Sequence, residues 1–249
     1  MPPAPTKDKG GIVIFGGYEM YEISFPTPDE MKKLKKFSTH FEFSDSEFIG
    51  EQFTILDDET IKLRTWARIL AQRLRELNFS YIMASYYYQN GIPDEPYYDK
   101  TSNKYFPQFT ENQHWSNKEG FEYYSEVFLF KSFSALDTIA HILSINYGIK
   151  WPKISFNKSI VDRLLEFNPE KFERLKGIIE SGNFNKIRTH RHNATHNISP
   201  GQVDSGLFTD QNGMTISSTG RYTPVSERYR MMTSLKNDVF EVVDIVKQK

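Results

Sequence analysis

The sequence contains no cysteine in its 249 residues. This absence excludes disulfides, thiolate metal ligands and cysteine nucleophiles, and it fits a reducing compartment such as the cytosol. The formal net charge is only -1. A nucleic acid would therefore have to be held by a local basic patch, because the protein as a whole provides no positive field.

Long hydrophobic runs are also missing at the start of the chain. The apolar stretch 12–15 is too short for a signal sequence or a membrane span. We therefore expect a cytoplasmic protein that does not cross a membrane. The 38% of hydrophobic residues is still enough, at this length, to bury a sizeable core.

Helical periodicity dominates the chain after the first fifty or so residues. The apolar and capping patterns predict helices over residues 28–37, 59–89, 116–146, 159–167, 169–181, 183–198 and 225–246. The second long helix is expected to begin at Ser116, with Glu119 at its third helical position completing a capping box. The fold class that follows is mainly α.

Two short β elements accompany the predicted helices. Residues 12–25, interrupted by Gly16 and Gly17, have the β-branched and aromatic content of a strand pair. The dipeptide Asn212-Gly213 predicts a hairpin before the last helix. We expect an N-terminal extension with short strands over residues 1–56 and a helical domain over 57–249, with 203–222 as a hairpin insertion.

A loop rich in aromatic residues is predicted between the two longest helices, over residues 91–115. Its aromatic residues include Tyr97, Tyr98, Tyr105, Phe106 and Phe109. Packing of these rings on the helices or in a subunit interface is the favoured interpretation. Stacking on the bases of a single nucleic-acid strand is the alternative.

The most concentrated titratable chemistry lies in Phe184–Ile198, FNKIRTHRHNATHNI. This segment holds three of the six histidines and two arginines, and no Asp or Glu occurs from Ser181 to Val203. A fold that exposes the segment therefore presents a cationic patch. Such a patch predicts an anionic ligand.

On a helical wheel, Arg191 falls in an otherwise apolar seam. The other members of the seam, at steps of three and four residues, are Phe184, Ile187, Ala194 and Ile198. A guanidinium at a core position is costly unless it is paired or the position opens onto a cleft or a partner subunit. Arg188, His192 and His196 share the adjoining face.

These residue types fit phosphodiester chemistry without a metal. A histidine can take a proton from an RNA 2′-hydroxyl or give one to the leaving oxygen, while an arginine neutralises charge on the phosphate. Zinc binding by His192 and His196 is the alternative, but no acidic ligand follows in the next turn and no glutamate lies between them. We expect no metal and no cofactor.

The hexapeptide from Arg191 to His196, RHNATH, resembles the motif of the HEPN family, an arginine and a histidine separated by four to six residues. HEPN proteins are helical domains that often act as metal-independent ribonucleases. The residue after the arginine is usually polar, and His192 fits. The resemblance covers about residues 57–249, including the helical stretch 133–143, FSALDTIAHIL. It implies an up-and-down bundle of four to five helices.

The resemblance also implies an arrangement of the site. HEPN nucleases are typically homodimers whose motif helices face each other. This resolves a geometric difficulty, because Arg191 and His196 are separated by about 140° on one helix. The implied roles are phosphate binding by Arg191, general acid/base catalysis by His196, orientation by His192 and Asn193, and binding of flanking phosphates by Arg188 and Lys186.

Two functional hypotheses follow from the resemblance. The first is an endoribonuclease that cleaves single-stranded RNA by 2′-hydroxyl attack in a toxin or antiphage setting, with an antitoxin or defence protein as a further partner. The second is a non-catalytic HEPN-like module that binds a nucleotide, an RNA or a protein.

Asp137 and His141 lie four residues apart in the most apolar helix. We expect them to satisfy each other or a backbone group, with a supporting catalytic role as the alternative.

Overall fold

The computed structural model describes a defined part of the chain. The described residues are 12–16, 19–41, 43–49, 57–94, 109, 111–150, 154–196, 207–209, 215–217 and 223–247. For residues 12–16, 19–22, 193–196, 207–209 and 215–217 only the backbone is described. The statements below refer to these residues.

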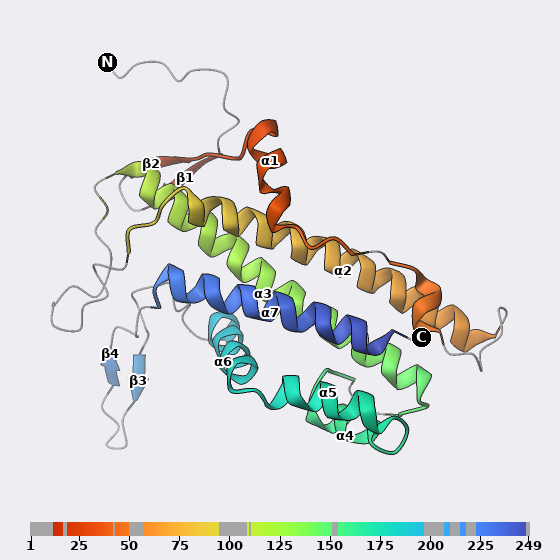
Figure 1. Cartoon of the computed structure of the whole chain (residues 1–249). Helices are drawn as coiled ribbons and strands as arrows, with labels where there is room; N and C mark the ends of the chain where they lie inside the picture. Colours follow the sequence, from red (N-terminus) through yellow and green to blue (C-terminus); the bar gives the residue numbers. More distant parts are fainter. Residues whose placement is uncertain are drawn as a thin grey trace, which may run out of the picture. The chain divides into compact units, whose positions relative to one another are not determined.

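Seven α-helices make up most of the described chain (Figure 1). They are α1 (Pro28–Leu34), α2 (Asp58–Gln89), α3 (Asn112–Asn146), α4 (Lys158–Leu164), α5 (Pro169–Glu180), α6 (Gly182–His196) and α7 (Val225–Val246). Two 3₁₀ turns, η1 (Lys35–Phe37) and η2 (Asp45–Phe48), complete the helical elements. The predicted mainly α class is confirmed.

The strands are short and form two separate antiparallel pairs. β1 (Ile12–Gly16) pairs with β2 (Glu19–Ile23), with Ile14 opposite Tyr21. β3 (Leu207–Thr209) pairs with β4 (Thr215–Ser217). The turn at Asn212-Gly213 lies outside the described residues. The division into an N-terminal extension over 1–56 and a helical domain over 57–249, with a hairpin insertion over 203–222, stays a prediction.

The short helices begin where their capping residues place them. At α1, the Thr27 hydroxyl accepts a hydrogen bond from the Glu30 backbone N–H, and the Glu30 carboxylate accepts from the Thr27 backbone N–H. At α5, Asn168 caps the helix and Pro169 occupies its first position. Both starts follow from sequence, because these side chains satisfy amide groups that the helix itself leaves unpaired.

The predicted start of α3 is wrong by about one turn. The helix begins at Asn112, so Ser116 lies inside it and is buried, and the expected capping box of Ser116 and Glu119 does not form. Trp115 explains the earlier start, since its ring packs 4.9 Å from that of Phe109 and its indole N–H donates to the Phe109 carbonyl. The predicted loop therefore ends before Asn112, and residues 95–108 lie outside the described part.

The chain divides into two compact units. The first unit contains residues 1–38, 80–126 and 193–229, and the second contains 39–79, 127–192 and 230–249. The second unit has an aliphatic core whose members are almost fully buried: Leu63, Leu70, Leu74, Leu77, Leu136, Ile139, Leu143, Ile187, Leu235, Val239 and Val242. The apolar middle of α3 thus lies in a core, as its sequence predicts.

The first unit has a more aromatic and more polar interior. Its buried residues include Tyr81, Tyr87, Phe121, Asp94, Lys118 and Arg228. α3 is long and apolar enough to cross a membrane, but 61% of its most hydrophobic window is buried inside the protein. Packing therefore accounts for its hydrophobicity.

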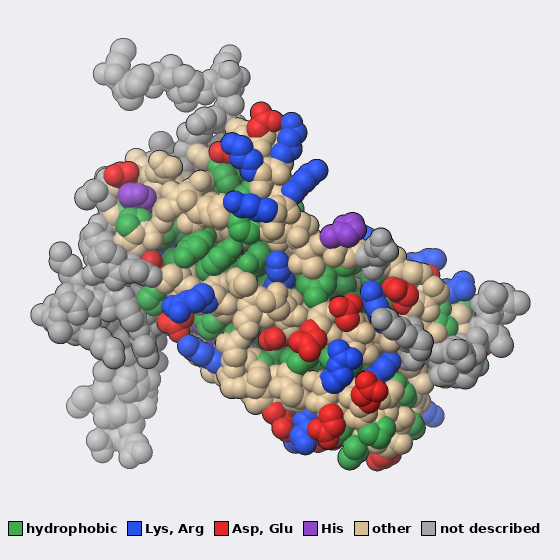
Figure 2. Space-filling model, viewed as in Figure 1, with side chains coloured by type: hydrophobic (Ala, Val, Ile, Leu, Met, Phe, Trp, Pro, Cys, Tyr) green, Lys and Arg blue, Asp and Glu red, His purple; other side chains and the backbone are tan. Residues whose placement is uncertain are grey.

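The surface mixes charges of both signs. Over the described residues in view in Figure 2, many Lys and Arg side chains lie beside Asp and Glu side chains. The described ion pairs include Lys158 with both Asp162 and Glu180, and Arg163 with Glu166. This surface agrees with the net charge of -1, so a basic ligand-binding surface must be local.

Candidate functional site

The start of α6 is fixed by polar contacts within the second unit. The Ser181 hydroxyl accepts a hydrogen bond from the Phe184 backbone N–H at 3.1 Å. The Asn185 amide donates to the carbonyl of Ile179 at 3.1 Å, and Asn183 is hydrogen-bonded to Ser234 of α7. These bonds join the helix to the end of α5 and to α7, so its orientation is well specified.

The seam predicted for α6 is present as far as the side chains are described. Phe184 and Ile187 are 2% and 0% exposed, and Arg191 follows them at a half-buried position. Phe133 of α3 packs against this seam, with its ring centroid 5.9 Å from that of Phe184. The Arg191 guanidinium lies 5.5 Å from the centroid of the same Phe133 ring. Arg191 therefore lies at an apolar edge of the helix, where an aromatic face attracts its charge.

Three further basic side chains among the described residues of α6 are open to solvent. Lys186, Arg188 and His192 are exposed, and His190 is half-buried. No acidic residue occurs from Ser181 to Val203. α6 thus has an apolar edge that carries Arg191 and an exposed basic face, which is the division that the helical wheel predicts.

The second half of the motif is described only as backbone. Asn193 and His196 belong to α6, but their side chains lie outside the described residues. The roles assigned to them, and the pairing of His196 with Arg191, stay predictions. Among the described residues, no group of three or more His, Asp and Glu side chains is arranged to hold a metal ion.

Asp137 and His141 have separate contacts in the second unit. The Asp137 carboxylate accepts a hydrogen bond from the Phe156 backbone N–H at 2.9 Å, so the expected backbone partner is confirmed. The His141 ring stacks on Trp66, with centroids 3.9 Å apart and planes within 7°. Burial lowers the pKa of His141, Arg73 lowers it further, and the Asp137 charge opposes both. A supporting catalytic role for this pair stays a prediction.

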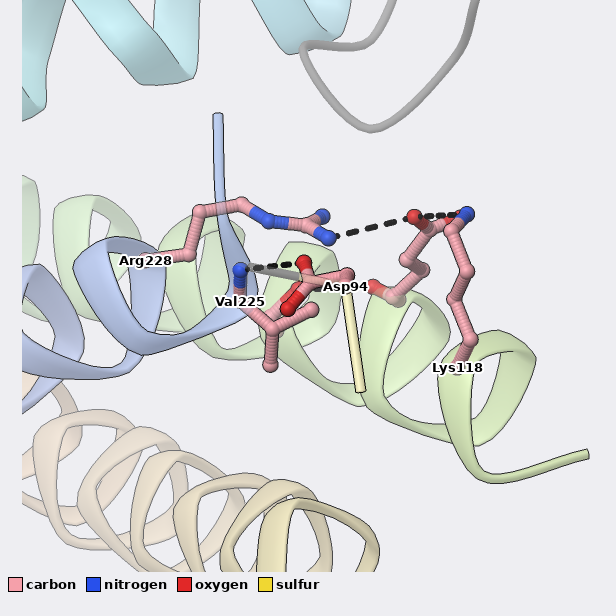
Figure 3. Close-up of polar contacts among 6 residues, drawn as sticks. Asp94, Lys118, Val225 and Arg228 are labelled. Carbon is pink, nitrogen blue, oxygen red and sulfur yellow. Dashed lines mark hydrogen bonds and ion pairs between the residues drawn. The ribbon is translucent and has the colours of Figure 1, made fainter. Parts of the chain in front are cut away.

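Sequence reasoning missed a buried cluster of charges in the first unit. Lys118 and Glu122 of α3 and Arg228 of α7 have side chains that are 2%, 14% and 5% exposed. Figure 3 shows Arg228 and Lys118 reaching toward the same carboxylate, that of Glu122. The Lys118 Nζ and an Arg228 terminal nitrogen lie 2.5 and 3.2 Å from Glu122 Oε1. The spacing of four between Lys118 and Glu122 is a detectable signal, whereas Arg228 is 106 residues away.

Asp94 holds the start of α7 beside this cluster (Figure 3). Its carboxylate accepts a hydrogen bond of 2.8 Å from the Val225 backbone N–H, at the first residue of the helix. Asp94 is 1% exposed, so this is a buried cap. An acid at this place satisfies an amide that the helix leaves unpaired and opposes the positive end of the helix dipole.

These observations define the class as a mainly helical domain. Its basic helix, α6, follows the two shorter helices α4 and α5 and precedes the long last helix α7. Comparison with known families identifies it. A model of the Cthe2314-like HEPN family matches residues 66–244, well over half of the chain. The chain therefore belongs to the HEPN family, which is often associated with ribonuclease activity. No curated protein and no solved structure matches the chain.

Proposed function

We propose that this protein is a metal-independent endoribonuclease of HEPN type that cleaves single-stranded RNA. In this proposal Arg191 binds the scissile phosphate and His196 acts as general acid/base. The 2′-hydroxyl attacks the neighbouring phosphorus, the bond to the 5′-oxygen of the next nucleotide breaks, and a 2′,3′-cyclic phosphate remains. The fold proposed around the site is an up-and-down bundle of four to five helices.

The position of Arg191 carries the proposal. The arginine follows two buried residues of an apolar seam, lies over the Phe133 ring, and stands in a segment without acids. A guanidinium binds a phosphate diester through paired, charge-assisted hydrogen bonds, so an arginine at the border of the apolar seam and the exposed basic face suits a phosphate ligand.

A homodimer completes the proposed site. Arg191 and His196 are separated by about 140° around α6, so one straight helix does not direct both at one phosphate. Two copies of α6 facing each other would bring Arg191 of one chain close to His196 of the other. His192 and Asn193 would orient the substrate, and Lys186 and Arg188 would bind flanking phosphates.

The test of catalysis uses labelled single-stranded RNA in excess chelator. Wild-type protein is expected to cleave it and to leave 2′,3′-cyclic phosphate ends. Arg191→Ala and His196→Ala are each expected to lose about 100-fold or more in rate. His190→Ala is the matched control on the same helix and should retain activity. Cleavage that survives in both motif variants would overturn the proposal.

Mixing the two inactive variants tests the dimer. If Arg191 of one chain works with His196 of the other, a mixed dimer of Arg191→Ala and His196→Ala retains one intact site. Equal mixing after denaturation and refolding should restore about a quarter of wild-type activity. A mixture as inactive as its components would exclude a site shared in this way.

The proposed cellular setting is a toxin or an antiphage defence system in the cytoplasm. An RNA-cleaving protein of this kind needs control, so an antitoxin or a defence partner belongs to the same proposal. Growth arrest of a bacterial host on expression, lost in Arg191→Ala and retained in His190→Ala, would support it. Equal arrest by both variants would contradict it.

A further inference from the structure

A pocket in the first unit has no described residue of α6 in its lining. It has a volume of about 340 Å³ and is lined by Ile23, Phe25, Tyr87, Glu119, Gly120, Tyr123 and Tyr124. Tyr123 is 64% exposed and Phe25 is 39% exposed, whereas Tyr87 is 1% exposed. The pocket therefore combines a buried aromatic wall with aromatic rings that face solvent, which a protein rarely leaves uncovered without a use.

Gly120 makes room for the aromatic wall. A Cβ at this position would lie 2.6 Å from the Tyr87 ring, closer than side-chain atoms approach one another. The absence of a side chain thus allows the Tyr87 ring to lie against α3. Tyr124 lies nearly parallel to Tyr87, at 17° with centroids 6.0 Å apart, and Tyr123 meets Tyr124 edge-on at 5.1 Å. The three rings therefore pack against one another.

The lining restricts the chemistry of a ligand. The described lining residues include no Lys, Arg or His, so they offer no cation to a phosphate group. The polar side-chain groups of these residues are the tyrosine hydroxyls and the carboxylate of Glu119. Because α3 begins at Asn112, Glu119 lies in the second turn of the helix and does not act as a capping residue. An occupant should therefore be planar and apolar on its faces, with hydrogen-bond donors at one edge for a carboxylate.

We infer that this pocket binds a nucleobase of the RNA, with a preference for guanine. The inference rests on the proposed function for its choice of ligand. A base stacks on the exposed tyrosine and phenylalanine rings, as bases of single strands do on aromatic side chains. Guanine has two adjacent N–H donors, N1–H and the 2-amino group, which match the two oxygens of the Glu119 carboxylate. The pocket thereby selects the RNA sequence, and the chemistry takes place elsewhere.

The test compares guanosine with inosine, which differs only by lacking the 2-amino group. Binding to the full chain is measured by saturation-transfer NMR and calorimetry. Guanosine is expected to bind several-fold more tightly than inosine. Tyr123→Ala should weaken both by about tenfold, and Glu119→Gln should remove the preference while retaining stacking. Phe130→Ala is the matched control, since Phe130 is another exposed aromatic residue of α3, 53% exposed, outside the pocket lining.

Several results would overturn the inference. One is guanosine binding that is unchanged in Tyr123→Ala. Another is binding of choline at the Tyr123 site with no binding of any nucleoside, which would identify a site for a quaternary ammonium group. Nucleosides have no scissile phosphate, so these outcomes do not depend on cleavage. RNA cleavage without nucleoside binding removes only this inference, and nucleoside binding without cleavage removes only the proposed catalysis.

Discussion

The first turns of α3 and the helix α6 use basic residues in opposite ways. In α3, Lys118 is almost fully buried and forms an ion pair with Glu122, which also binds Arg228. In α6, Lys186, Arg188 and His192 are exposed in a segment without acids. A buried cation requires a nearby carboxylate, because its lost hydration must be replaced. An exposed cation keeps its hydration and does not depend on such a carboxylate.

The largest loss of stability is expected on removal of the Glu122 carboxylate, which Lys118 and Arg228 share. Glu122→Gln leaves two buried cations without their acid, and we expect the free energy of unfolding to fall by about 3–5 kcal/mol. Urea denaturation followed by circular dichroism measures the change. The control is Asp29→Asn, which removes an exposed pair with Lys32 and should cost below about 1 kcal/mol. Equal effects of the two substitutions would contradict the contrast between buried and exposed charge.

A second substitution tests how tightly the start of α3 is packed. Gly120→Ala places a methyl group against the buried Tyr87 ring, and we expect a loss of about 1–3 kcal/mol in the free energy of unfolding. Gly177→Ala is the matched change in α5, where no atom lies within 4 Å of the new methyl group. It should stabilise the protein by about 0.5–1 kcal/mol, since alanine favours a helix. If both substitutions stabilised the protein, the Tyr87 ring would have to move aside for the new methyl group.

A pH titration extends the comparison to histidines. Burial lowers the pKa of His141 below its ordinary value of 6.5, whereas His40 is exposed. Between 6.5 and the lower folded-state pKa, the unfolded chain binds more protons than the folded one. The free energy of unfolding should therefore fall as the pH drops through this window, by below about 1 kcal/mol for a partly exposed ring. Thermal unfolding from pH 8 to pH 5 measures it.

The matched variants for this titration are His141→Gln and His40→Gln. The first should reduce the loss of stability at low pH, because the proton uptake of the unfolded chain at this position disappears. The second removes an exposed histidine and serves as the control substitution. An unaltered pH dependence in His141→Gln would show that this ring does not contribute.

The smallest expected effect concerns the exposed face of α6. Arg188→Ala should reduce the slope of log K against log salt for single-stranded RNA by about 0.7, with little change in stability. Fluorescence anisotropy at several salt concentrations measures the slope. Arg75→Ala, which removes an exposed arginine of α2, should leave it unchanged. A slope that responds equally to both would mean that RNA binding does not depend on α6 in particular.

Local patterns predicted most helix boundaries. α7 spans Val225–Val246 as its periodicity predicts, and α2 begins one residue before its predicted start. The start of α3 was wrong because the packing of Trp115 on Phe109 is a contact that capping rules do not contain. Helix periodicity also predicted the apolar seam of α6, since the seam depends only on spacing within one helix.

The clusters that join distant segments could not be read from sequence. Nothing in the composition of α7 indicates that Arg228 meets Glu122, because 106 residues separate them. The sequence does not reveal the pocket on α3 for a related reason, since its pattern places Glu119 in a capping box and Gly120 has no pattern of its own. The partner of Arg191 in catalysis stays a prediction that rests on the motif.

The bond between Asp94 and Val225 has a consequence for the synthesis of the protein. It joins residues 131 positions apart, and the chain between them includes α3 and the whole of α6. Closing so long a segment is slow, and it requires that α7 has been made. The motif helix leaves the ribosome before α7, so the buried cap and the Arg228 ion pair form only after translation has passed the candidate site.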